Sequence, residues 1–195
     1  MFDALVQLVL SLVATPVASA ATLEDKNWQE KTPVQVEEQA ANPYLSKTDL
    51  VNASDGTLYW VVAVLDGDTL LVSAPDRSTF QVRLLAVDTN EINGPDSTAE
   101  CYGIEAANFT LDFLKNRAVY LSADPANQDL DPFGRKLRYV DVLKEDGSIV
   151  RLNDALLKTG MASYPAQYPT STPDYFKSLE DTAKANDLGQ WGACN

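Results

Sequence analysis

The amino-acid sequence predicts an α+β fold, a small five-stranded β-barrel with three helices. Five short segments are rich in β-branched and aromatic residues, as strands usually are. One segment with helical periodicity lies between the third and the fourth of them, and two more helical segments follow the fifth.

The first three strands are expected to form a meander. They are residues 58–65, which read LYWVVAVL, and the segments 69–74 and 79–87. Residues 66–68 (DGD) and 75–78 (PDRS) separate these segments and are turn signals.

A helix is predicted over residues 103–116, because its polar residues share one narrow arc of the helical projection. Apolar residues fill the remaining arc, so we expect the fold to cover most of this helix. Two further strands are predicted at residues 118–123 and 136–143.

Two helices are expected near the end of the sequence. Asn153 has a side chain suited to a helix cap, and the short helix that it begins stops at Gly160. The last helix begins at Thr172-Pro173, where proline suits the first turn, and ends near Gly189. Five strands with a helix between the third and the fourth are the pattern of the OB-fold, a Greek-key barrel that often binds nucleic acids. The fold alone does not determine the chemistry.

The sequence divides into three parts. Residues 1–20 predict a signal peptide or an N-terminal anchor, with a short apolar stretch that ends in the cleavage pattern Ala18-Ser19-Ala20. Before the apolar stretch the segment carries Asp3 and no Lys or Arg, so cleavage and anchoring both stay open. Residues 21–56 are polar and acidic and are expected to form a flexible linker. Residues 57–195 are the expected folded domain.

The chain has no histidine and two cysteines. Histidine general bases, Ser-His and Cys-His triads and most zinc sites are therefore excluded, and any chemistry must use carboxylates, arginines, hydroxyls or a hard metal ion. In an exported protein Cys101 and Cys194 are expected to form one disulfide, the alternative being two free, buried thiols. It would close a loop of about 90 residues and stabilise the fold by about 4 kcal/mol. The export signal expected in residues 1–20 predicts a secreted or periplasmic protein.

The overall charge is strongly negative, with 15 Lys and Arg against 28 Asp and Glu and a net charge of −13. Nucleic-acid binders are usually basic. If this chain binds a polyanion, recognition has to depend on where a few arginines lie and not on the overall charge.

Three short clusters carry residues capable of chemistry. Residues 66–69 (DGDT) place two carboxylates on a tight turn, which is also common in plain hairpins. Residues 83–91 (RLLAVDTNE) put an arginine on a barrel strand, where it needs a partner, and a structural salt bridge to Asp88 or Glu91 would supply one. Residues 131–135 (DPFGR) read on their own as a loop with a surface arginine.

Taken together and in this order, the three clusters resemble the staphylococcal nuclease family. The resemblance covers about residues 59–192, nearly the whole expected domain, and the segments 101–106, 153–157 and 189–191 also look like helix starts and ends of that family. It implies a calcium-dependent phosphodiesterase on an OB-fold, which cuts DNA and RNA and leaves 3′-phosphate ends.

The resemblance also implies a role for each matching residue. Asp68 and Asp88 would bind one Ca²⁺ together with the backbone carbonyl of Thr89, since calcium prefers oxygen ligands. Arg83 and Arg135 would grip the phosphate from two sides, because the planar guanidinium group matches phosphate oxygens.

Two further residues take roles near the reacting bond. Glu91 would hold the attacking water and is the candidate general base. Tyr164 would pack against a nucleotide base, since stacking suits every base, the alternative being a loop aromatic that covers the barrel. Asp66 is expected to brace its own turn.

Three positions depart from the family's pattern. Asn90 stands where the family usually has proline, so we expect a looser turn around Glu91. Pro132 and Phe133 stand where the staphylococcal type has a lysine and a tyrosine that contact a terminal phosphate, so tight binding of nucleotide bisphosphates is not expected.

Two other classes of function stay open. A nuclease-like barrel can bind nucleic acid or protein without cutting, although such domains usually lose an arginine or a calcium carboxylate, and this chain has them all. An acidic extracellular protein can also use calcium only to hold a loop. We expect a monomer with no stable protein partner, and no membrane contact unless the N-terminal segment stays uncleaved.

Overall fold

The computed structural model describes residues 54–94, 98–115, 117–144 and 147–194. They all fall in the second of the two units into which the chain divides, residues 40–195. The expected signal segment and nearly all of the expected linker lie outside the described residues. The first strand begins at Ser54, so the last residues of the expected linker belong to the barrel.

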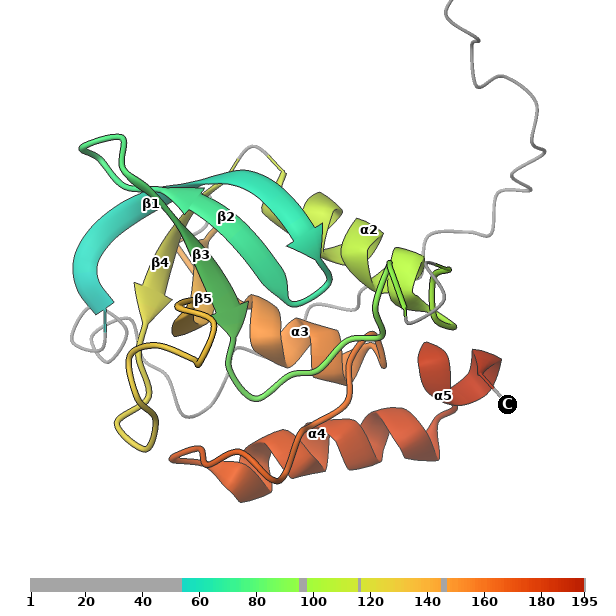
Figure 1. Ribbon diagram of the computed structural model, residues 1–195. Helices are drawn as coiled ribbons and strands as arrows, with labels where there is room; N and C mark the ends of the chain where they lie inside the picture. Colours follow the sequence, from blue (N-terminus) through green and yellow to red (C-terminus); the bar gives the residue numbers. More distant parts are fainter. Residues whose placement is uncertain (1–53, 95–97, 116, 145–146, 195) are drawn as a thin grey trace, which may run out of the picture. The chain divides into compact units, whose positions relative to one another are not determined.

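Five strands form a closed barrel (Figure 1). They are β1 (Ser54–Asp66), β2 (Thr69–Ser73), β3 (Thr79–Leu84), β4 (Ala118–Ser122) and β5 (Lys136–Leu143). Antiparallel pairs run in the order β3-β2-β1-β4-β5, and a parallel pair between β3 and β5 closes the barrel. The predicted α+β fold with a five-stranded OB-type barrel is confirmed.

A sixth strand, β6 (Ile149–Arg151), pairs antiparallel with β5. It has three residues, too few to show the alternation by which the other strands are recognised in the sequence. It leads directly into the next helix.

Three helices match the predicted ones: α2 (Gly103–Leu114), α3 (Leu152–Lys158) and α4 (Pro173–Ala185). A single additional turn, α5 (Gln190–Ala193), follows α4. In Figure 1 α3 lies between the barrel and α4. Because it is covered from both sides, α3 is buried from Leu152 to Leu157.

The barrel interior and the helices beneath it share one aliphatic core. Its fully buried large side chains are Leu70, Leu84, Leu152, Leu156, Leu157, Val72, Val82, Val87, Val119, Val140, Val142 and Phe176. Burying each such side chain stabilises the fold by about 1.5–3 kcal/mol. Within the described residues, no helix has the length and apolar character needed to span a bilayer.

The prediction that Asn153 caps α3 is wrong. Asn153 lies inside the helix, and the residue at the cap position is Arg151, which makes no side-chain capping bond. The amide of Asn153 accepts a hydrogen bond from Val140 N (3.0 Å) and donates one to the carbonyl of Leu85 (2.7 Å). The side chain satisfies two buried backbone groups and so fastens α3 to the barrel, which local sequence rules do not reveal.

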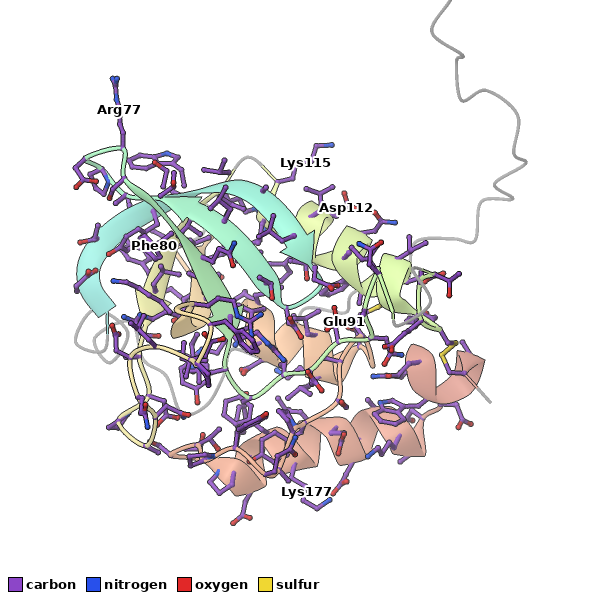
Figure 2. All side chains as sticks on the ribbon, viewed as in Figure 1. Arg77, Phe80, Glu91, Asp112, Lys115 and Lys177 are labelled. Atoms are coloured by element: carbon purple, nitrogen blue, oxygen red, sulfur yellow. A yellow bond between two sulfur atoms is a disulfide. The ribbon has the colours of Figure 1, made fainter. Side chains whose placement is uncertain are left out.

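The expectation that most of α2 is covered is also wrong. Ile104 and Leu111 are each 51% exposed. The side of the helix that faces the fold is formed by small residues, among them Ala106 and Thr110, which allow close packing. The polar side points outward, as Asp112 shows in Figure 2.

Candidate active site

The strand register brings the three clusters to one end of the barrel. Thr69, the first residue of β2, pairs with Arg83 near the end of β3. Val82 in β3 pairs with Lys136, the first residue of β5, which Arg135 directly precedes. The turn before β2, the loop after β3 and the loop before β5 therefore meet.

The turn between β1 and β2 is packed closely against its neighbours. Asp66 accepts a hydrogen bond from Gly67 N (2.8 Å), which braces the turn. A Cβ atom on Gly67 would lie 2.8 Å from the side chain of Thr89, so only glycine permits this approach. On α2, Thr110 donates a hydrogen bond to the carbonyl of Gly67 (2.7 Å). This packing fixes the position of the next residue, Asp68.

The guanidinium group of Arg83 lies between two carboxylates. Its Nη1 atom is 2.9 Å from Asp68 Oδ2, and its Nη2 atom is 2.6 Å from Asp88 Oδ1. Nη1 also donates to the carbonyl of Val87 (2.8 Å). The backbone of Asp88 exchanges two hydrogen bonds with Ser163, which holds it from the other side. Arg83 thus has two carboxylate partners, which meets the need for a salt bridge expected of an arginine on a barrel strand.

Asp68 is a buried carboxylate with several partners. Thr69 Oγ1 donates to its Oδ1 atom (3.0 Å), and Thr89 N donates to its Oδ2 atom (2.9 Å). Burial raises the pKa of Asp68 above its ordinary value, and the charge of Asp88 adds to this, although Arg83 and the hydrogen bonds act in the opposite direction. Carboxylates that are costly to ionise are concentrated at functional sites.

Arg135 is held in place by the loop that carries it. Asp131 accepts a hydrogen bond from Arg135 Nε (2.6 Å) and another from its backbone N–H (2.8 Å). Arg135 Nη1 donates to Thr69 Oγ1 (3.3 Å). Since Thr69 also contacts Asp68, and Asp68 contacts Arg83, one continuous series of contacts joins the two arginines.

Glu91 belongs to the segment between β3 and α2, where Figure 2 labels it. A hydrogen bond with Asp66, partial burial and the negative charges of Asp66 and Asp68 raise the pKa of Glu91 to about 7, while Arg83 lowers it. A carboxylate with a pKa near neutrality is suited to act as a general base.

The oxygen atoms of Asp68, Asp88 and the Thr89 carbonyl fit a hard divalent cation such as Ca²⁺. The negative charge shared by Asp66, Asp68 and Glu91 also favours a cation. The buried Thr89 hydroxyl has no hydrogen-bond partner among the described residues. The part of the chain that the structure describes holds no group of three or more His, Cys, Asp or Glu side chains arranged around a metal ion. Water and phosphate oxygens would therefore have to complete the ligand set.

The aromatic residues near the site differ in exposure. Tyr164 is half-buried, its ring is stacked on Phe176 with 6.1 Å between the centroids, and its hydroxyl lies 3.4 Å from Thr170 Oγ1. Tyr164 therefore packs against the core, and its contact with a nucleotide base stays a prediction. Phe133, in contrast, is 83% exposed, and the guanidinium carbon of Arg135 lies 5.4 Å from its ring centroid. The sequence could have predicted this contact, because the DPFGR cluster places Phe133 two residues before Arg135.

The turn around Glu91 is anchored and not loose. The side-chain amide of Asn90 donates to the carbonyl of Cys101 and to Oε1 of Gln190 (3.3 Å). Cys101 and Cys194 are joined by a disulfide. Nothing in the sequence links Asn90 with Gln190, because their contact depends on the tertiary fold alone.

Comparison with known proteins then places the chain in a family. Residues 81–193 match the family model described as staphylococcal nuclease homologue. The chain belongs to the staphylococcal nuclease family. Asp68 precedes the matched residues, and its place beside Arg83 comes from the structure.

Similar members of the staphylococcal nuclease family come from several bacteria. The thermonuclease of Staphylococcus hyicus is 39% identical over 135 residues, which is 69% of this chain and 73% of that protein. The thermonuclease of Staphylococcus intermedius is 37% identical over 107 residues, 55% of this chain and 59% of that protein. Endonuclease YncB of Bacillus subtilis is 31% identical over 160 residues, 80% of this chain and 70% of that protein.

Proposed function

We propose that this member of the staphylococcal nuclease family is a calcium-dependent nuclease that hydrolyses phosphodiester bonds in DNA and RNA. The observation that carries the proposal is the series of contacts from Arg135 through Thr69 and Asp68 to Arg83. It fixes two guanidinium groups at the end of the barrel where Glu91 also lies. Relatives named thermonuclease and endonuclease support the same activity.

The residues have complementary roles in hydrolysis. Arg83 and Arg135 bind the non-bridging oxygens of the phosphate and stabilise the negative charge that grows as water attacks. Glu91 accepts a proton from the attacking water. A bond forms between the water oxygen and phosphorus while the bond from phosphorus to the 5′ oxygen breaks. The 5′ oxygen takes a proton from solvent, which leaves a 3′-phosphate and a 5′-hydroxyl.

Asp68, Asp88 and the carbonyl of Thr89 are the ligands that we assign to Ca²⁺. When bound, the ion supplies charge stabilisation at the phosphate and orients it. The contacts of Asp68 with Thr69 and Thr89 keep its carboxylate beside Arg83. The chemistry needs no histidine, in agreement with the composition.

We also infer that the protein acts outside the cytoplasm, in a secreted or periplasmic form. The disulfide between Cys101 and Cys194 supports this, because disulfides persist in oxidising compartments. Nucleic acid is the substrate, and we expect the protein to act as a monomer. Cell fractionation with detection of the protein tests the location, and a cytosolic protein with free thiols would contradict it.

Plasmid nicking tests the proposed function. The purified protein is expected to nick plasmid DNA with Ca²⁺ and to be inactive with EDTA. Arg83→Ala and Arg135→Ala are expected to lose activity, whereas Lys177→Ala, on the exposed side of α4, keeps it. Full activity in either arginine variant would show that the assigned roles are wrong.

The same preparation separates the nuclease from the two other classes of function. A binding module would retain nucleic acid without cutting it. A protein that uses calcium only for structure would gain stability from the ion without hydrolysis. At a hundredfold excess of Ca²⁺ over Kd, binding stabilises by about 2.7 kcal/mol, or about 5–10 °C in Tm for a domain of this size. Such a rise in Tm without nicking would favour the structural role.

A further inference from the structure

Glu91 is held by its backbone against the start of α2. Glu91 N donates to Glu100 Oε2 (3.0 Å), and Glu100 N donates to the carbonyl of Glu91 (2.9 Å). A Cβ atom on Gly103 would lie 2.5 Å from the Glu91 carbonyl oxygen, so the two segments are in close contact. The side chain of Glu91, in contrast, is exposed. Its position depends on where this backbone is held and on its hydrogen bond with Asp66.

The residue before Glu91 reaches a different part of the chain. The amide of Asn90 donates to the carbonyl of Cys101 and to Gln190 Oε1. Cys101 is in turn bonded covalently to Cys194. The loop that carries Glu91 is thus connected to α5 through one hydrogen bond and, by way of Cys101, through a disulfide.

The α5 turn is itself fixed to the rest of the fold and can serve as an anchor. Gln190 N donates to the carbonyl of Gly160 (2.9 Å), two residues after the end of α3. A Cβ atom on Gly160 would lie 2.1 Å from the carbonyl oxygen of Leu188, and one on Gly189 would lie 2.3 Å from the carbonyl oxygen of Gly160. The two backbones are therefore packed directly against each other. Cys194 N donates to the carbonyl of Gln190 (2.9 Å), which completes the turn.

We propose that Asn90, Gln190 and the Cys101–Cys194 disulfide form a C-terminal clamp that positions Glu91 to accept a proton from the water that attacks the phosphate. The inference rests on the proposed function of Glu91. Asn90 is a positioning residue that acts through Glu91 and does not contact substrate. Arg83 and Arg135 are held by Asp68, Asp88 and Asp131 instead. The clamp therefore affects the reaction step and not the binding of phosphate.

Kinetics of three purified full-length proteins test the clamp: the oxidised wild type, the double variant Cys101→Ser/Cys194→Ser and Asn90→Ala. They are compared on one oligonucleotide with Ca²⁺, well below the Tm of each protein. A displacement of about 1 Å in a catalytic group costs about 10²-fold in rate. We expect kcat to fall by about 10-fold to 100-fold in the double variant, with KM within about twofold.

Two matched variants control for indirect effects. Asn186→Ala removes an amide at the end of α4 whose hydrogen bond goes back to that helix, to the carbonyl of Thr182. Val142→Ala destabilises the core inside the barrel. Both are expected to keep kcat.

Repeating the clamp variants in a Glu91→Gln background separates positioning from general weakening of the fold. If the clamp acts through Glu91, its loss causes no further fall in kcat there, because the two changes remove the same interaction. An equal fall in both backgrounds, or a rise in KM with kcat unchanged, would overturn the proposal.

Hydrogen exchange gives a readout that needs no activity. On reduction of the disulfide, amides in residues 88–94 and 98–103 are expected to exchange faster, while β5 stays protected. Unchanged exchange in those two segments would overturn the clamp. If the wild type does not hydrolyse nucleic acid, the proposed function fails, and the exchange result alone decides whether the clamp holds the loop.

Discussion

Arg135 and Arg83 are joined through two side chains that lie between them. Arg135 Nη1 donates to Thr69 Oγ1 (3.3 Å), Thr69 Oγ1 donates to Asp68 Oδ1 (3.0 Å), and Asp68 Oδ2 lies 2.9 Å from Arg83 Nη1. The two guanidinium groups are thus held at the same end of the barrel by intervening partners. This arrangement supports the proposal that the two groups bind one phosphate from two sides.

Replacing Arg83 is expected to lower both activity and stability. Arg83→Ala removes a phosphate-binding group, and removal of such a preorganised donor costs about 10²–10³ in kcat. It also leaves buried Asp68 without its ion-pair partner, which costs about 3 kcal/mol in the free energy of unfolding. Single-turnover hydrolysis and urea unfolding of the same preparation measure the two effects.

The double variant Arg83→Ala/Asp68→Asn distinguishes the two losses. Neutralising Asp68 removes the unpaired buried charge, so we expect most of the stability to return while activity stays low. Recovery of hydrolysis along with stability would show that Arg83 acts only as a structural partner of Asp68.

Phe133 is expected to contribute to substrate affinity. Its ring is 83% exposed and lies beside the guanidinium group of Arg135, so an unpaired base next to the bound phosphate can stack on it. Stacking is worth about 1–3 kcal/mol per base, and Phe133→Ala should raise KM about tenfold or more with kcat little changed. Trp60→Ala, an aromatic residue on the outside of β1 that is 52% exposed, is the matched control. The interpretation fails if both variants shift KM equally.

The carboxylate of Asp124 should make stability depend on pH. It accepts hydrogen bonds from Tyr139 Oη (2.6 Å), Ser171 N (2.9 Å) and Ala126 N (2.8 Å). Burial alone would raise its pKa, but these hydrogen bonds, together with one that Ser171 Oγ donates, bring the pKa below the ordinary value of 3.8. Because the folded-state pKa is depressed, the carboxylate stabilises the fold above pH 3.8, and this stabilisation is lost as pH falls through the lower folded-state value.

Urea unfolding from about pH 7 to about pH 2 measures this contribution. Asp124→Asn should reduce the free energy of unfolding at neutral pH and flatten its fall in acid. A variant with the same acid dependence as the wild type would show that other carboxylates are responsible.

The acidic surface should change how activity responds to salt. At physiological ionic strength the screening length is about 8 Å, so most of the net charge of −13 is screened and the local arginines dominate. We expect nucleic-acid binding weaker than that of a basic homologue, with activity retained or increased at about 0.15 M salt. Initial rates across a salt series check this. Highest activity at very low salt without added divalent ions would contradict it.

Much of the fold could be predicted from local patterns. The strand segments are rich in β-branched residues, and the periodicity of residues 103–116 indicated α2 to within two residues at its end. The strand β6 has only three residues, which is too short for the alternation of apolar and polar residues that would predict a strand. The prediction that Asn153 is a helix cap was wrong because its amide forms hydrogen bonds with Val140 and Leu85, which lie far from it in the sequence.

The candidate site shows the same division between local and tertiary information. The three clusters made Arg83, Asp68 and Arg135 candidates, but the contact of Arg83 with Asp68 depends on the pairing of β2 with β3. The link from Asn90 to Gln190 spans 100 positions and has no local signal. Contacts of this kind are set by the packing of α5 against the end of α3.

Hydrolysis of one 5′-labelled oligonucleotide by the wild type and by Glu91→Ser, with Ca²⁺ and with EDTA, tests the central claim most directly. With Ca²⁺ the wild type should release fragments that end in a 3′-phosphate, and Glu91→Ser should be slower by about 10²–10⁴. Neither protein should cut in EDTA. Equal rates for the two proteins, cleavage in EDTA, or fragments with 3′-hydroxyl ends would contradict the account.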